Sequence, residues 1–359
     1  MQKINLSLST KIFTMTIILL GFGLIMIYSA SVAEGARDFG NKWHFVQLQL
    51  KWASLGLVAM LITSSISPRV WEKIAPFLLI FGLILLFLVV IPGIGTKVQG
   101  ARRWLVLPGI NIQPSELIKL IEVIYLSSWL HTRRISFLQF GFFIAIISGL
   151  IMLQPDMGTT LVVTLLAITM SFLTGYPVKY LLTMGAIGLT LGSILIIAEP
   201  YRLDRVKTFI NPLQDKQGSS YHMRQVLLSL GSGGISGLGI GRSRQKYAYL
   251  PEATTDSIFA VVGEELGFIG AVTLILTFIY YLSLIFKVAS NEHDNFGSTM
   301  VAGIASWMGL QVCLNLAAMV ALTPLTGVPL PLVSYGGSAL ITMLVGIGLV
   351  LSVARHQKL

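Results

Sequence analysis

The chain has 359 residues, of which 54% are hydrophobic and only 11% are charged, and its mean hydropathy is +0.80. Soluble domains carry about 25% charged residues, so this composition excludes an ordinary soluble protein and indicates one with many membrane spans. The formal net charge is +10. Because the sequence shows no basic soluble domain, we attribute this charge to a membrane surface with anionic lipid and exclude nucleic acid as the partner.

Ten apolar windows follow one another along the chain, and most reach the roughly 20 residues that a bilayer-spanning helix needs. They cover residues 12–33, 44–66, 72–92, 115–131, 136–154, 158–175, 178–198, 257–287, 298–322 and 333–354. No segment shows the alternating pattern of a membrane barrel. We therefore predict an all-α, polytopic membrane protein with about ten transmembrane helices, organised as one membrane domain over residues 1–359.

The basic residues of the short loops predict the orientation, since Lys and Arg accumulate on the cytoplasmic side. With both termini cytoplasmic, ten bases lie inside: Lys3, Lys11, Arg69, Lys73, Arg133, Arg134, Lys179, Lys287, Arg355 and Lys358. The short outer loops then hold five: Arg37, Lys42, Lys97, Arg102 and Arg103. Ten against five favours this orientation.

One long polar segment, residues 201–256, separates the seventh and eighth windows and is predicted to be extracytoplasmic. It carries eight bases, which indicates an anionic partner on that side: Arg202, Arg205, Lys207, Lys216, Arg224, Arg242, Arg244 and Lys246. Its stretch 231–241 has six glycines in eleven residues. Such a run can direct backbone N–H groups at phosphate, but it is also typical of a flexible connector or of tight helix packing.

Two further segments, 93–114 and 324–338, are rich in Pro and Gly. Because these residues break helices, we expect ordered turns or re-entrant pieces there. Several irregular segments on one face predict a cavity at the outer side of the membrane.

Charged residues inside the fourth window form a candidate site. Glu116, Lys119 and Glu122 are spaced by three, so they share one helix face. Ionisable groups at membrane depth normally face the bundle interior and mark function. The alternative is an internal ion pair that only holds helices together. Asp156 lies at an outer turn, where it serves either as a turn or cap residue or in catalysis.

The arginine pair and the aspartate of the outer segments each have two possible roles. Arg102 and Arg103 precede Trp104 and are either an interfacial anchor or a phosphate clamp. Asp256 stands directly before an apolar window and is either a helix N-cap or a base. Glu252 lies four residues upstream of Asp256. Arg242 and Lys246 lie upstream of both carboxylates. Cations beside a carboxylate favour binding of an anionic substrate, from which the carboxylate can remove a proton.

These motifs resemble those of the SEDS family (shape, elongation, division and sporulation), which includes FtsW, RodA and SpoVE. The resemblance covers essentially the whole chain. It rests on Arg-Arg-Trp at 102–104 with Gln-Pro-Ser-Glu-Leu-Ile-Lys at 113–119, on Gln-Pro-Asp-Met-Gly-Thr at 154–159, on Leu-Pro-Glu-Ala-Thr-Thr-Asp at 250–256 and on Pro-Leu-Val-Ser-Tyr-Gly-Gly-Ser at 331–338. The stretch 241–252 is more similar to the FtsW/SpoVE branch than to RodA.

The resemblance implies a ten-helix peptidoglycan polymerase of the bacterial cytoplasmic membrane, acting outside on lipid II for division or elongation. It implies Asp256 as the catalytic base. The implied substrate-binding residues, together with those suggested by charge, are Arg102, Arg103, Glu116, Lys119, Asp156, Arg242, Lys246, Glu252, Ser334 and Ser338. Three positions depart from the family pattern. Thr254 replaces the motif histidine, Ser257 the aromatic after the aspartate, and Ala339 the serine that follows Ser338.

The partners implied are a class B penicillin-binding protein and other divisome or elongasome membrane proteins. No cofactor is predicted, although a divalent cation is compatible with the leaving-group chemistry. Two alternatives stay open. A lipid II flippase would use Glu116 and Lys119 to line its path, and a non-catalytic scaffold would only recruit a transpeptidase.

Overall fold

The structure is a computed structural model that describes residues 7–98, 100–107, 110–132, 135–210, 220–243 and 250–356. Its helices are α1 (Leu8–Phe39), α2 (His44–Ser65), α3 (Pro68–Val90), α4 (Pro114–Thr132), α5 (Phe137–Met152), α6 (Met157–Leu173), α7 (Val178–Ala198), α8 (Pro200–Ile210), α9 (Ser220–Gly233), α10 (Ile258–Asn291), α11 (Asn295–Met319) and α12 (Gly337–His356). Its strands are β1 (Gly95–Val98), β2 (Ala101–Leu107) and β3 (Ile110–Ile112).

The helices confirm the all-α polytopic fold. Within the described residues, seven helices are long and apolar enough to cross a membrane: α1, α2, α3, α7, α10, α11 and α12. Two shorter apolar helices, α5 and α6, have 16 and 17 residues. Helix α4 has 19 residues and carries the three charged side chains predicted to share a face. These ten helices correspond to the ten apolar windows.

Helices α11 and α12 form the centre of the bundle, whereas α7 lies at its edge. Of the most apolar stretch of each helix, 72% is buried in α12 but only 11% in α7. Helix α12 packs closely along α2. Small residues permit this approach, as membrane helix pairs require. A Cβ on Gly348 would lie 2.0 Å from Thr63 Oγ1, and one on Gly56 would lie 2.5 Å from Leu344 Cδ1.

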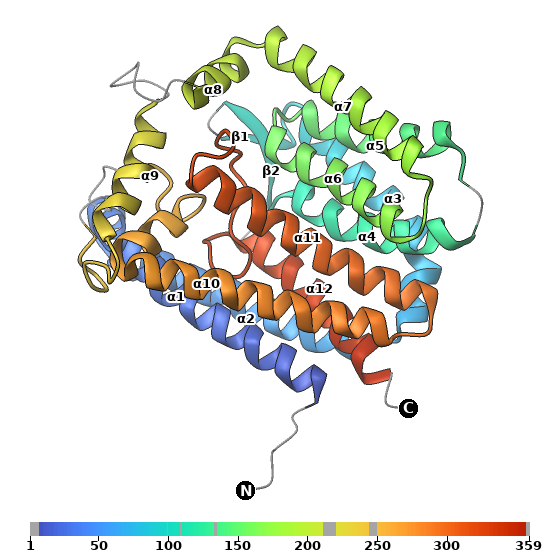
Figure 1. The fold of residues 1–359 in the computed structure, drawn as a ribbon, viewed down its shortest axis with the longest axis horizontal. Helices are drawn as coiled ribbons and strands as arrows, with labels where there is room; N and C mark the ends of the chain where they lie inside the picture. Colours follow the sequence, from blue (N-terminus) through green and yellow to red (C-terminus); the bar gives the residue numbers. More distant parts are fainter. Residues whose placement is uncertain are drawn as a thin grey trace, which may run out of the picture.

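The two ends of the bundle differ. Figure 1 shows the start of α1 and the end of α12 toward one end, with the small sheet, α8 and α9 toward the other. The described parts of the irregular segments singled out in the sequence lie at this second end, which places the expected cavity there.

The segment 93–114 differs from the prediction of turns or re-entrant pieces. Its described residues form a three-stranded antiparallel sheet in the order β1-β2-β3. The strand β2 carries Trp104 and Val106, residue types that fit a pleated surface. Gly100 has a φ of 85° in the turn before β2. The Pro and Gly residues correctly predicted where the helices end, but they did not indicate the short strands between α3 and α4.

The polar segment 201–256 also has more regular structure than predicted. Helix α8 continues directly from the end of α7, and α9 packs along α10. The face of α9 that is buried carries Ser220, Met223, Val226, Ser229 and Gly233, at the spacing of one helix face.

The glycine run after α9 pairs with a break in α10. Helix α10 is interrupted at Gly267, where φ is 68° and ψ is −167°. Four backbone hydrogen bonds join the two segments: Leu238 N to Glu264 O, Gly239 N to Glu265 O, Phe268 N to Gly234 O and Ile269 N to Ile235 O. A Cβ on Gly237 would lie 2.2 Å from Glu265 O, and its φ of 79° also favours glycine. Tight packing therefore accounts for Gly233 and Gly237, and a positive φ accounts for Gly234, Gly239 and Gly241.

Two buried carboxylates of α10 form further hydrogen bonds around the glycine run. Ser29 of α1 donates to Glu265 at 2.6 Å, and Ser243 donates to Glu264 at 2.6 Å. Buried carboxylates of this kind are stable only when hydrogen-bonded. They therefore anchor the end of the glycine run to α10 and α1.

We predict that Gly233→Ala destabilises the protein by about 1–3 kcal/mol, the usual cost of overpacking. A Cβ at this position would lie 2.0 Å from Gly263 O of α10. Gly231→Ala is the matched control, because Gly231 is in the same helix and a Cβ there would meet no neighbouring atom within 4 Å. Thermal unfolding of both variants in detergent checks this, and equal melting temperatures would contradict it.

Candidate functional site

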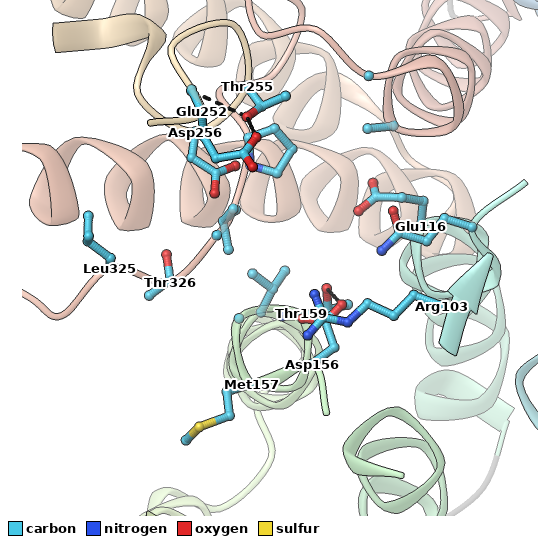
Figure 2. Close-up of a pocket in the computed structure, with 18 of the residues that line it drawn as sticks. Arg103, Glu116, Asp156, Met157, Thr159, Glu252, Thr255, Asp256, Leu325 and Thr326 are labelled. Carbon is cyan, nitrogen blue, oxygen red and sulfur yellow. Dashed lines mark hydrogen bonds between the residues drawn. The ribbon is translucent and has the colours of Figure 1, made fainter. Parts of the chain in front are cut away.

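A cavity of about 870 Å³ opens at the end of the bundle that carries the sheet, α8 and α9. Its walls come from α2, α4, α6, α8, α9 and the start of α12, from strands β2 and β3, and from the two irregular segments before α10 and α12. Seven of the predicted site residues line it: Arg103, Glu116, Lys119, Asp156, Glu252, Asp256 and Ser338. Figure 2 shows Glu252 and Asp256 on one side of this space and Arg103 and Asp156 on the opposite side.

The main chain at Asp256 is fixed by a side chain of α11. Asn315 donates through Nδ2 to Asp256 O at 2.9 Å and to Val328 O at 2.8 Å. Ser334 Oγ donates to Thr255 O at 2.6 Å, and Tyr335 N donates to Thr254 O at 2.9 Å. The turn before α10 and the segment before α12 therefore form one hydrogen-bonded unit.

The carboxylate of Asp256 is available to a ligand. Among the described residues, no hydrogen bond reaches either of its oxygens. It lies against Gly327, where a Cβ would be 3.4 Å from Asp256 Oδ2 and where φ is 72°. The N-cap of α10 is Ser257, and its side chain makes no capping hydrogen bond. Asp256 is therefore not the helix cap that its position in the sequence also allowed.

The surroundings of Asp256 raise its pKa from the ordinary 3.8 to about 7. Removal of water from around the half-buried carboxyl group is the largest cause, and the negative charge of Glu252 adds to it. Arg205 lowers the pKa, Asp156 raises it further and Arg103 lowers it again. A carboxyl group with this pKa exchanges its proton near neutral pH, which suits a general base.

Glu252 adopts a strained backbone conformation next to this carboxyl group. Its φ is 50°, an uncommon value for a residue with a side chain. The conformation closes a tight turn in which Glu252 O accepts from Thr255 N and Ser257 N. Leu332, in the segment tied to this turn, has a φ of 63°. Strain of this kind persists only where the surrounding structure enforces it, and it clusters at functional sites.

The opposite wall is built on the turn before α6. Asp156 is the N-cap of α6 and accepts from Thr159 N at 3.1 Å and from Thr159 Oγ1 at 2.9 Å. Arg103 donates through Nε to Gln154 O at 3.1 Å and through Nη2 to Pro155 O. Asp156 is therefore a helix cap, one of the two roles that the sequence allowed. Arg103 stabilises the same turn, and its charged group lines the cavity.

Glu116 and Lys119 form an ion pair in the floor of the cavity. Lys119 Nζ lies 2.7 Å from Glu116 Oε1, and both side chains are buried. Lys119 also lies 5.7 Å from the centre of the Trp307 ring. The pair therefore joins α4 to α11 and, at the same time, contributes charge to the cavity, so the geometry accommodates both roles considered from the sequence.

Three of the predicted residues lie away from the cavity lining. Arg102 is on β2 beside Lys97, Arg242 is exposed, and Ser334 is buried, where its hydroxyl fastens two loop segments. Ser338, in contrast, lines the cavity and joins α12 to the sheet through Asn111 O and Gln113 N. Lys246 lies outside the described residues.

Several residues of this site were not singled out from the sequence. Arg205 of α8 lines the cavity and donates to Leu325 O at 3.0 Å. In the sequence it is one of eight loop bases, and nothing distinguishes it from the others. Asn315 could have been found, because an amide side chain in an apolar window usually has a buried partner. His222 of α9 also lines the cavity.

The described residues include no group of three or more His, Cys, Asp or Glu side chains arranged to hold a metal ion.

Comparison with known proteins assigns the chain to a family. The sequence model of the cell cycle protein family of FtsW, RodA and SpoVE matches residues 10–359. The chain belongs to this family. A probable peptidoglycan glycosyltransferase FtsW of Trichlorobacter lovleyi is 39% identical over 352 residues, covering 96% of this chain and 92% of the relative. The stage V sporulation protein E of Bacillus subtilis is 37% identical and covers 96% of both chains.

Solved structures of the family share the fold. A chain of a peptidoglycan synthase complex that coordinates polymerization and crosslinking superposes with a TM-score of 0.80, at 29% identity over 97% of both chains. The rod shape determining protein RodA of Thermus thermophilus superposes with a TM-score of 0.73, also at 29% identity over 97% of both chains. The family and its FtsW/SpoVE branch, expected from the motifs, are therefore confirmed.

We predict that the stability of Asp256→Asn increases relative to that of the wild type as the pH rises from about 5 to about 8. The pKa of Asp256 in the folded protein is above its ordinary value. Between the ordinary pKa of 3.8 and the folded-state pKa of about 7, the folded state binds more protons than the unfolded state. The stability of the wild type therefore falls as the pH rises through 7. Asn cannot ionise and escapes this loss. Melting temperatures in detergent across this range check the prediction, and a pH-independent difference between the two proteins would contradict it.

Proposed function

We propose that this chain is a peptidoglycan glycosyltransferase that polymerises lipid II into β-1,4 glycan strands at the outer face of the cytoplasmic membrane. The observation that carries the proposal is the carboxylate of Asp256, which faces the large cavity and has a pKa of about 7. The names of the relatives, among them probable peptidoglycan glycosyltransferase FtsW, support the same reaction class.

In this proposal Asp256 removes the proton from the 4-hydroxyl of the acceptor sugar as that oxygen attacks the anomeric carbon of the donor. The bond from the anomeric carbon to the pyrophosphate breaks, and the electron pair leaves with the phosphate oxygen. Attack from the face opposite the α-linked leaving group gives the β linkage. Pyrophosphate is a good leaving group once its charge is neutralised, so the second carboxylic acid that a glycosidase uses to protonate its leaving group is unnecessary.

The cavity cations would stabilise the departing pyrophosphate. Arg103 and Arg205 both line the cavity, and each is held by a backbone carbonyl group. Their charges are therefore fixed before the substrate arrives, which is the arrangement that stabilises developing charge most effectively. Lys119 also lines the cavity, but Glu116 balances its charge. Of the two arginines predicted at 102 and 103, we keep Arg103 in this role.

The arrangement of the helices supports an outward-facing site. The cavity lies at the end of the bundle opposite the start of α1 and the end of α12 (Figure 1). The distribution of Lys and Arg in the sequence favours a cytoplasmic location for those two ends. A lipid-linked substrate would then enter from the outer leaflet.

A transpeptidase is the partner we propose, because glycan strands require cross-linking. One of the similar solved structures is a chain of a complex that coordinates polymerization and crosslinking. We assign the partner to the class B penicillin-binding proteins on the grounds of the sequence resemblance.

We predict that Asp256→Asn and Asp256→Ala abolish polymerisation of purified lipid II, while the wild type with its transpeptidase partner makes glycan strands that a gel resolves. Loss of a general base typically lowers the rate by about 10²–10⁴-fold. Asp294→Asn is the control, because Asp294 caps α11 at the N-terminal end of that helix and does not line the cavity.

Two outcomes would contradict the proposal. Undiminished polymer from folded Asp256 variants would remove Asp256 as the base. Absence of polymer from the wild type with a competent partner, together with lipid II translocation that depends on Glu116 and Lys119, would favour the flippase.

We predict further that kcat/KM rises with pH along an acid limb centred near pH 7, because only the ionised form of Asp256 accepts a proton. The limb reports the pKa of about 7 in the free protein. Rates of lipid II consumption at limiting substrate, measured between about pH 5 and 9, check this. A flat profile in that range would show that another group limits the reaction.

A further inference from the structure

Helix α9 places an imidazole beside the Asp256 turn. His222 lines the cavity, and its Nε2 lies 2.7 Å from the hydroxyl oxygen of Ser257, the residue directly after Asp256. Ser257 is fully buried, and its hydroxyl has no capping role in α10. Among the described residues, His222 is the partner of this hydroxyl. The contact therefore connects α9 to the turn that carries the proposed base.

The packing of α9 holds this imidazole in place. Met223 and Val226 are buried against the bundle, and Gly233 at the end of the helix approaches Gly263 of α10. His222 is next to Met223 and only half-buried, so its accessible part faces the cavity that both residues line. No described residue makes a hydrogen bond to Nδ1 of His222. This nitrogen is therefore available to whatever occupies the cavity.

The chemistry of the pair suits a ligand with hydroxyl or amide groups. Burial lowers the pKa of His222, so the ring is neutral near neutral pH. A neutral imidazole has one donor and one acceptor nitrogen, and a serine hydroxyl can donate or accept. The hydroxyl of Ser257 can therefore match either tautomer of the ring. Nδ1 is left to accept from a sugar hydroxyl or to donate to a carbonyl oxygen.

Two departures from the motif that this sequence resembles lie close to this pair. Thr254 stands in place of the motif histidine, and Thr254 is buried with its carbonyl oxygen bound to Tyr335 N. Ser257 stands in place of an aromatic residue, which could not form this hydrogen bond. In this chain, the imidazole near the aspartate comes from α9.

We propose that His222 is a substrate-binding residue that hydrogen-bonds a hydroxyl or amide group of the acceptor saccharide next to the hydroxyl that Asp256 deprotonates. This inference rests on the proposed function and assigns a binding residue to the acceptor side of the same cavity. The structural alternative is that His222 only fastens α9 to the start of α10.

The test uses the full chain with its transpeptidase partner and lipid II as the substrate. Initial rates are measured against lipid II concentration for the wild type, His222→Phe, His222→Gln, Ser257→Ala and Asp256→Asn. His131→Gln is the matched control. His131 also pairs with a hydroxyl, Thr299 Oγ1 at 2.6 Å, but it lies roughly 22 Å along α4 from Glu116 at a rise of 1.5 Å per residue.

We expect His222→Phe to raise KM about tenfold, which corresponds to the loss of roughly one hydrogen bond to the substrate. The change in kcat should be smaller. His222→Gln, which keeps a donor and an acceptor, should recover most of this loss. Ser257→Ala should raise KM less than His222→Phe, because the imidazole remains. His131→Gln should match the wild type in KM.

Three results overturn the inference. If the His222 variants retain the wild-type KM while Asp256→Asn is inactive, the proposed function stands and His222 does not bind the substrate. If His222→Phe and Ser257→Ala lower the melting temperature equally and change KM equally, the contact is only a fastener. If the wild type makes no polymer, the proposed function fails, and this inference fails with it.

Discussion

The site depends on how the polar groups of two irregular backbone segments are satisfied at the edge of a membrane. A bilayer offers few partners for unpaired N–H and C=O groups, so irregular backbone at this depth has to be paired within the protein. Asn315 meets this requirement by donating to Asp256 O and Val328 O from a single amide. Ser334 and Tyr335 complete the connection to the turn. The proposed base, Asp256, is therefore positioned by main-chain contacts, and no described residue forms a hydrogen bond to its carboxylate.

The need to pair backbone carbonyl groups also explains how the two cavity arginines are held. Arg103 braces the turn before α6, and Arg205 braces the segment after α11, each through carbonyl oxygens. These hydrogen bonds help to hold both guanidinium groups at the cavity. The cavity consequently combines fixed positive charge with a carboxyl group that dehydration keeps partly protonated. Such an arrangement suits a reaction in which a proton leaves one oxygen and negative charge grows on another.

The sequence predicted the features that depend on local composition. Hydropathy located the ten helices, and charge inside an apolar window identified Glu116 and Lys119. The motif resemblance and charge together identified Asp256, Glu252 and Arg103 among the cavity residues. The sheet was missed because its strands are short and separated by Pro and Gly. Arg205 and His222 were missed as site residues because only the fold brings α8 and α9 to the same cavity. Asn315 does not line the cavity, and its role was visible only from its hydrogen bonds to two backbone carbonyl groups. The glycine run could be interpreted only when its partner, the break at Gly267, was visible.

The strained conformations at Glu252 and Leu332 limit how this protein can be engineered. Each lies in one of the two segments that Ser334 joins, and each holds a side-chain-bearing residue at a positive φ that usually costs about 1–3 kcal/mol. Replacement by glycine would relieve that strain, but it would also loosen the turn that carries the proposed base. Selection for heat resistance alone is therefore expected to favour changes at these positions that reduce turnover. Thermostable forms for structural work are better sought in the lipid-facing surfaces, away from this junction.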